Sequence, residues 1–177
     1  MKYLLPAVAA VLALVGLSGP SNARMKPRPM SQEQYLQRAA SGNQFVMESS
    51  QLALRKSNNE DIKKFAQRMI HDHTKIGNGL KATLQKANLP EPKAGLDRAD
   101  ETLLMKLRNE KGPAFERNYV RDLRQVHIQA LRLTEGYARA GTNPALKKFA
   151  VRTLPMVREH LKLAEALPGG RNLTARR

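Results

Sequence analysis

Four long stretches of this 177-residue sequence repeat their apolar residues with the 3.6-residue period of an α-helix. A helix of this kind is apolar along one side only, and that side must be covered by other helices. The apolar sides run through residues 35–53, 62–84, 115–137 and 146–164. The pattern therefore predicts an all-α domain built as a four-helix bundle.

Residues that favour helix N-termini mark where three of these helices begin. Ser31 followed by Gln34 is the sequence pattern of a capping box. Asn58 or Asn59 can cap the second helix, which should run for about thirty residues and end before the prolines near residue 90. Pro113 suits the first turn of the third helix, where a missing N–H leaves nothing unpaired.

The fourth helix carries a proline in its interior. Residues 141–144, Gly-Thr-Asn-Pro, end the third helix and open the fourth. Pro155 then falls inside the apolar pattern, where its ring removes one backbone hydrogen bond. We expect the fourth helix to be kinked at Pro155 or broken there into two pieces.

The connection between the second and third helices, residues 89–112, is too long for a tight turn. It begins Leu-Pro-Glu-Pro and contains a short amphipathic segment with Leu96, Leu103, Leu104 and Leu107. About fourteen helical residues would span roughly 21 Å, so the connection can cross the height of a bundle. A crossover makes the second and third helices parallel, as in the ferritin-like topology. We predict a ferritin-like four-helix bundle with a long crossover that contains a short helix.

Four polar side chains interrupt the apolar faces, one on each predicted bundle helix. They are Glu48, His73, His127 and His160, and each lies near the middle of its helix. Polar groups directed into a bundle need partners, and a metal ion is the usual partner for His and Glu there. In the crossover topology, Glu48 and His160 are displaced from the middle in the same direction, so all four side chains can meet. The pattern predicts a candidate metal site of three histidines and one carboxylate.

Two neighbouring residues could support such a site. Asp72 could orient His73 or take the place of the carboxylate, and Tyr119 could donate a hydrogen bond from two turns before His127. His71 lies about 200° around its helix from His73 and should face solvent. The ligand set would suit a single ion of zinc, copper or iron. The same residues could instead form a buried hydrogen-bond network without metal, or fail to converge.

The sequence resembles the family called domain of unknown function 4142, which comprises exported bacterial proteins, over about residues 34–167. The segments that carry the resemblance are 39–54 with Ala-Ala-Ser-Gly and Glu48, 65–75 with Phe-Ala-Gln-Arg-Met-Ile-His-Asp-His-Thr-Lys, 112–119 followed by His127, and 154–161 with Leu-Pro and Arg-Glu-His-Leu. Glu116 departs from the aspartate that is usual in the family. The resemblance implies a four-helix bundle in the periplasm or outer envelope, and a biochemical activity that is not established.

Comparison with ferritin-type di-iron sites argues against ferroxidase activity. Those sites use Glu-x-x-His pairs, and this sequence contains none. Glu159 directly precedes His160, and adjacent helical residues point about 100° apart, so both cannot face inward. The sequence also lacks a recognisable nucleophile motif and a glycine-rich phosphate loop. It therefore favours a protein that is not an enzyme.

The N-terminus has the three parts of a secretory signal peptide. Lys2 supplies the charge, residues 4–17 are apolar, and small residues precede a cleavage site after Ala23. We predict a signal peptide at residues 1–23, a flexible leader at 24–30, the bundle domain at 31–167 and a disordered basic tail at 168–177. Export places the protein in the periplasm or outer envelope. No later stretch has the roughly twenty apolar residues that a membrane span needs.

Basic residues dominate the charged residues, with 31 Lys and Arg against 15 Asp and Glu and a formal net charge of +16. For an exported protein, this excess favours anionic lipid or envelope polysaccharide as partners. We do not expect nucleic acid as a partner, because aromatic residues are few and Trp is absent. Two functions stay open: a metal-binding envelope bundle, and a non-enzymatic stress or adaptor protein whose basic surface docks on anionic envelope material.

Overall fold

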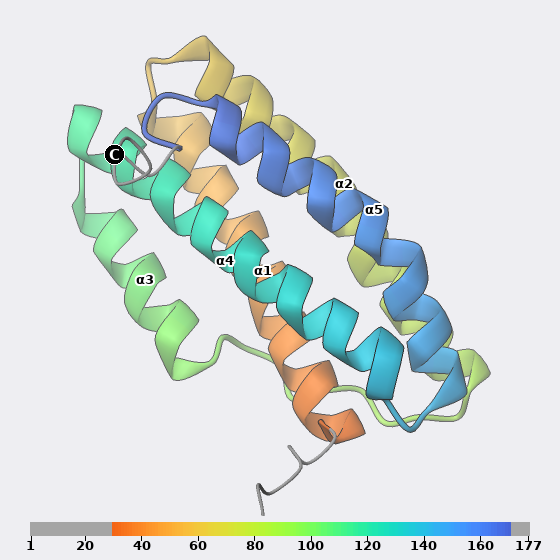
Figure 1. The fold of residues 1–177 in the computed structure, drawn as a ribbon. Helices are drawn as coiled ribbons and strands as arrows, with labels where there is room; N and C mark the ends of the chain where they lie inside the picture. The colour runs from red at the N-terminus through yellow and green to blue at the C-terminus, as the bar shows by residue number, and fades with distance from the viewer. Residues whose placement is uncertain (1–29, 171–177) are drawn as a thin grey trace, which may run out of the picture.

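The computed structural model describes residues 30–170, which contain five helices (Figure 1). In chain order they are α1 (Gln32–Lys56), α2 (Glu60–Lys86), α3 (Arg98–Asn109), α4 (Gly112–Ala140) and α5 (Pro144–Ala166). α1, α2, α4 and α5 form the bundle, and α3 lies outside it against α1 and α4. The predicted signal peptide, residues 24–29 of the leader and residues 171–177 of the tail lie outside the described residues.

Local sequence sets the helix ends much as expected. Ser31 and Gln34 form the capping box, with the Ser31 hydroxyl accepting a hydrogen bond from the Gln34 N–H at 3.1 Å. Of the two candidate caps, Asn59 is the N-cap of α2, and its side-chain oxygen accepts from two N–H groups of the first turn. α4 begins at Gly112, one residue earlier than expected.

α5 continues as one helix through Pro155, so a break at this residue is wrong. Proline lacks the N–H that would bond the carbonyl of Val151, four residues earlier. Val151 is 56 % exposed and therefore lies on the solvent side of the helix. Water can replace the lost donor there, so the helix tolerates the proline.

The ends of α1 and α4 show how the bundle is connected. At the turn between α1 and α2, Glu116 of α4 accepts hydrogen bonds from the Ser57 hydroxyl at 2.7 Å and the Asn58 N–H at 3.1 Å. At the other end of the bundle, Tyr35 of α1 stacks on Tyr137 of α4, with ring centroids 4.0 Å apart. α1 and α4 are therefore antiparallel, and α4 runs parallel to α2 (Figure 1). This confirms the predicted crossover and its short helix.

The C-terminal end of α3 is held by one lysine at the end of α1. The Lys56 ammonium donates to the backbone carbonyls of Leu107 at 3.0 Å, Arg108 at 2.5 Å and Glu110 at 2.9 Å. The last carbonyls of a helix lack the donors that the next turn would supply. Of these three carbonyls, that of Leu107 also accepts the Glu110 N–H at 3.4 Å. Lys56 therefore acts as a side-chain cap, supplied by another helix, that fixes the crossover against the bundle.

Two apolar clusters fill the bundle, one toward each end. Phe45, Phe65 and Phe115 belong to the cluster near the turn between α1 and α2. Tyr137 and Phe149 belong to the cluster at the opposite end. The middle of the bundle, between the two clusters, is where the central histidines lie. None of the helices in residues 30–170 combines the length and the apolar character needed to cross a membrane.

Candidate metal centre

Three of the four predicted site residues meet in the centre of the bundle. His73 of α2, His127 of α4 and His160 of α5 are all buried. Their ring centroids lie 5.5, 5.2 and 5.3 Å apart, so the rings form a nearly equilateral triangle. One nitrogen from each ring lies within 4.8 Å of the other two, which is the arrangement of a group that could hold a metal ion. The alternative in which the histidines do not converge is wrong.

Each ring is anchored through one of its two nitrogens to an oxygen. The pairs are His73 Nδ1 with Asn43 Oδ1 at 2.9 Å, His127 Nδ1 with the Leu123 carbonyl at 2.7 Å, and His160 Nε2 with Asp72 Oδ2 at 3.0 Å. Because a carbonyl, amide or carboxylate oxygen only accepts, the ring nitrogen in each pair is the donor. In a neutral ring the other nitrogen then carries a lone pair.

The three remaining nitrogens lack a suitable partner among residues 30–170. The Nε2 atoms of His73 and His127 lie 3.4 Å apart, and both are acceptors in the tautomers just described. His160 Nδ1 is buried and has no hydrogen-bond partner in this part of the chain. Buried polar atoms are almost always paired, so these unpaired nitrogens within one cluster call for a cation or a shared proton.

Burial keeps these rings neutral. Desolvation, reinforced by the neighbouring rings, lowers the pKa of His73 well below its usual value, and desolvation lowers the pKa of His127 to about 4. Desolvation also lowers the pKa of His160, although its hydrogen bond to Asp72 opposes the shift. Neutral imidazole is the form that binds metal ions, so at neutral pH no proton has to be displaced from these rings.

Asp72 hydrogen-bonds the ring of His160, whereas the sequence pattern indicated that it could orient His73. It is buried and bonds His160 of α5, while Arg68 and His71 also donate to its carboxylate. Burial raises the pKa of Asp72, but these three hydrogen bonds outweigh it and hold the pKa below its ordinary range. His71 points to solvent as expected, with 63 % of its side chain exposed.

The structure does not bring Glu48 to the histidines. Its carboxylate accepts hydrogen bonds from Gln44 at 2.8 Å and from Arg108 of α3 at 3.0 Å, and 31 % of the side chain is exposed. The α1 residue that reaches the cluster is Asn43, through its bond to His73. Asn43 lies four residues after Ala39, so helical periodicity could have placed it on the inner face.

Tyr119 does not reach the cluster either. Its hydroxyl is fully buried and shares a 2.9 Å hydrogen bond with Ser50 of α1. The eight residues between Tyr119 and His127 correspond to about 12 Å along a helix, which is longer than any side-chain hydrogen bond can bridge. Tyr119 therefore belongs to the packing of α1 against α4, away from the histidines.

One side of the histidine cluster faces open space. His73, His127 and Asn43 line a cavity of about 620 Å³ that also touches α5 and the start of α3. His160 is not among the lining residues. An ion held by the three rings would therefore be accessible from the side of His73 and His127.

Comparison with known proteins places the chain in a family. The model of the family described as Domain of unknown function (DUF4142) matches residues 18–167, and no curated protein matches the sequence. A DUF305 protein from Streptomyces coelicolor has the same fold, with a TM-score of 0.62, 16 % identity, and coverage of 76 % of this chain and 88 % of that chain. For a DUF305 fragment from Deinococcus radiodurans the TM-score is 0.66 at 15 % identity, over 77 % and 95 % of the two chains. Both likenesses support the ferritin-like fold, and the family match confirms the resemblance: the chain belongs to the DUF4142 family.

Proposed function

We propose that this protein is an exported envelope bundle that binds one transition metal ion through His73, His127 and His160. One observation carries the proposal: three buried rings, each anchored through one nitrogen, meet with one nitrogen of each ring within 4.8 Å of the other two, and the unanchored Nε2 atoms of His73 and His127 face each other at 3.4 Å. The predicted signal peptide supports placing this function in the periplasm or outer envelope.

The distance between the nitrogens of His73 and His127 suits two ligands of one first-row transition metal ion. Zinc–nitrogen bonds of 2.0–2.1 Å in tetrahedral geometry separate two ligand nitrogens by about 3.3 Å. The Nε2 atoms of His73 and His127 are 3.4 Å apart and already match this value. One nitrogen of His160 lies within 4.8 Å of the other two ligand nitrogens, so His160 would have to move closer for all three bonds to form. Imidazole ligands suit zinc, copper and iron alike.

The hydrogen bonds behind the rings also fit a metal centre. Metal-bound histidines usually donate their second N–H to a carboxylate or a backbone carbonyl, which fixes the tautomer and raises the basicity of the ligand nitrogen. Asp72 takes this role for His160 and the Leu123 carbonyl takes it for His127. A fourth coordination position would face the cavity, where water or a small ligand can enter, because Glu48 is paired with Arg108 instead.

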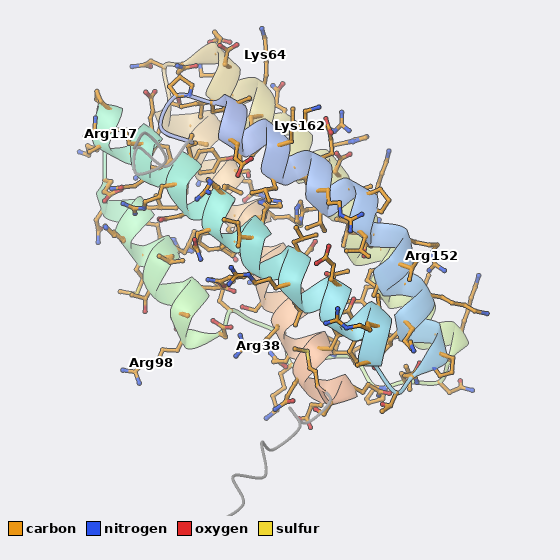
Figure 2. The ribbon with its side chains drawn as sticks, in the orientation of Figure 1. Arg38, Lys64, Arg98, Arg117, Arg152 and Lys162 are labelled. Carbon is orange, nitrogen blue, oxygen red and sulfur yellow. The ribbon has the colours of Figure 1, made fainter. Side chains whose placement is uncertain are left out.

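A metal-free hydrogen-bond network accounts for the same residues less well. It would have to place a proton between two nitrogens whose pKa values burial lowers, and His160 Nδ1 would still lack a partner among the described residues. The second hypothesis is that the basic surface docks on anionic envelope material. The basic side chains do not gather at one place in the way that the three histidines do. The basic side chains labelled in Figure 2 project from several sides of the bundle.

Metal titration of the mature protein tests the proposal. Protein stripped with a chelator should bind one zinc or cobalt(II) ion per chain by calorimetry, and cobalt(II) should give the visible absorption of a low-coordinate nitrogen site. His127→Gln and His160→Gln should each abolish this binding. His71→Gln is the control for loss of a histidine as such, because His71 is exposed and reaches the site only through its hydrogen bond to Asp72, so stoichiometric binding should persist with at most a small loss of affinity. Absence of stoichiometric binding, or equal loss in the His71 variant, would overturn the proposal.

A further inference from the structure

The cavity beside the histidines has the size and lining of a small-molecule site. Its volume of about 620 Å³ falls within the 300–1,000 Å³ that such sites usually have. Side chains from four bundle helices make its wall mainly apolar. The larger apolar ones include Tyr35, Val46, Ile76, Leu133 and Phe149.

Two arginines border the same cavity and are exposed to solvent, Arg38 of α1 and Arg132 of α4. Figure 2 shows Arg38 on the surface of α1 near the start of α3. No residue between 30 and 170 accepts a hydrogen bond from either guanidinium, and Arg38 has only a longer-range attraction to Asp100. Two positive groups at the edge of an apolar cavity are therefore free to bind an anion.

The acidic residues at this edge are already occupied by the protein. Asp97 is the N-cap of α3, and its carboxylate accepts from the N–H groups of Ala99 and Asp100. Asp100 accepts a 2.5 Å hydrogen bond from Ser41 of α1, and burial raises the pKa of Asp100. These contacts hold the start of α3 in place, and they leave the arginines as the positively charged side chains available to a ligand.

We propose that this cavity binds a small amphipathic anion. Its apolar body would lie among the apolar side chains of the wall, and its anionic group would bind Arg38 and Arg132. The preceding part of this chain is a poorer occupant, because Arg24, Lys26 and Arg28 would repel the arginines. The inference does not depend on a metal ion, since the arginines and the apolar wall are present without one.

Gly42 provides a way to fill the cavity without disturbing the bundle. It lies on α1 and lines the cavity, and a Cβ atom added there would meet nothing within 4 Å. A leucine at this position would therefore extend into open space and occupy the ligand volume. Gly136 of α4 is the matched control, since an added Cβ also meets nothing within 4 Å and the residue does not line the cavity.

Decanoate, an apolar chain with one carboxylate, is the probe, and calorimetry on chelator-treated protein is the assay. We expect saturable binding of one decanoate per chain that weakens as salt is added. Gly42→Leu should abolish it, and Gly136→Leu should leave it unchanged. Replacing both arginines, Arg38→Gln with Arg132→Gln, should weaken it by about tenfold or more, and these exposed substitutions should not affect folding.

The His160→Gln variant separates this inference from the proposed metal site. His160 does not line the cavity, so the variant should lose metal and still bind decanoate. Decanoate binding that survives Gly42→Leu, or that does not respond to loss of both arginines, would overturn the inference. Absence of saturable binding to the folded wild-type protein would do the same, whatever the result of the metal titration.

Discussion

Replacing Lys56 by methionine tests how the crossover helix is held on the bundle. The substitution keeps an unbranched side chain of similar length and removes the ammonium group. It therefore leaves the carbonyls of Leu107, Arg108 and Glu110 without their shared donor. Of these three hydrogen bonds, those to Leu107 and Glu110 are partly buried, while the bond to Arg108 is exposed to water.

The expected decrease in the free energy of unfolding depends on how far each of these hydrogen bonds is exposed to water. A hydrogen bond from a charged group contributes about 1.5–3 kcal/mol when water cannot replace it, and little when water can. Because the bonds to Leu107 and Glu110 are only partly buried, each should contribute about half of that value, or about 0.7–1.5 kcal/mol. Together with a cation at a helix C-terminus worth about 0.3–1 kcal/mol, they give an expected loss of about 2–4 kcal/mol. Because α3 lies outside the four bundle helices, part of this loss should appear as local opening of α3.

Urea unfolding monitored by circular dichroism measures the global loss, and amide hydrogen exchange of residues 98–110 measures the local one. Lys63→Met is the control, because Lys63 makes an exposed ion pair with Glu60 that should contribute at most about 1 kcal/mol. If Lys56→Met changed the free energy of unfolding no more than the control and left exchange in α3 unaltered, the capping role of Lys56 would be refuted.

Three further predictions concern buried polar groups. The free energy of unfolding of the metal-free protein should decrease as pH falls below about 6.5. In the unfolded chain the histidine at position 127 takes up a proton near that pH, whereas in the folded protein burial holds the pKa of His127 at about 4. His127 alone should therefore lower the free energy of unfolding by about 3 kcal/mol between pH 6.5 and 4. Urea unfolding across that range should show a shallower decline in His127→Gln, and an identical decline would contradict the assignment. Tyr119→Phe should lower the free energy of unfolding by about 1–3 kcal/mol, because it leaves the Ser50 hydroxyl without its partner. The double variant with Ser50→Ala should recover part of that loss. Tyr119→Phe should bind metal with the same affinity as the wild-type protein, because Tyr119 lies away from the histidines. Asp72→Asn should reduce metal affinity about 10- to 100-fold, and His71→Gln, which removes only an exposed hydrogen bond to Asp72, should have a much smaller effect. An unchanged affinity of Asp72→Asn in calorimetry would remove Asp72 from the support of His160.

Several features of the fold were predictable because they depend on neighbouring residues. The capping box at Ser31 and the cap at Asn59 act within a single turn, so sequence alone identifies them. The crossover follows from chain length, since residues 89–112 are too many for a turn and enough to return along the bundle. The prediction at Pro155 was too severe, because a proline on the solvent side of a packed helix need not break it.

The partners of the central residues were decided by tertiary structure. Periodicity places His73, His127 and His160 on inner faces, and it also permitted Glu48 to join them. The packing of α3 against α1 places Arg108 beside Glu48 instead. Asn43, five residues earlier on α1, is the residue that hydrogen-bonds His73. The choice of Asp72 between His73 and His160 has the same origin, because it depends on how α2 and α5 are rotated and shifted relative to each other.

The sequence by itself determined the helices, their order and the three histidines on inward faces, because these properties repeat locally along the chain. The tertiary structure alone decided which nitrogen of each ring is anchored, and that Arg38, Arg132 and an apolar wall surround one cavity. Contacts between helices change with shifts of a few ångströms and rotations of tens of degrees. Side-chain packing sets those shifts, and an apolar repeat read along a single helix does not encode them.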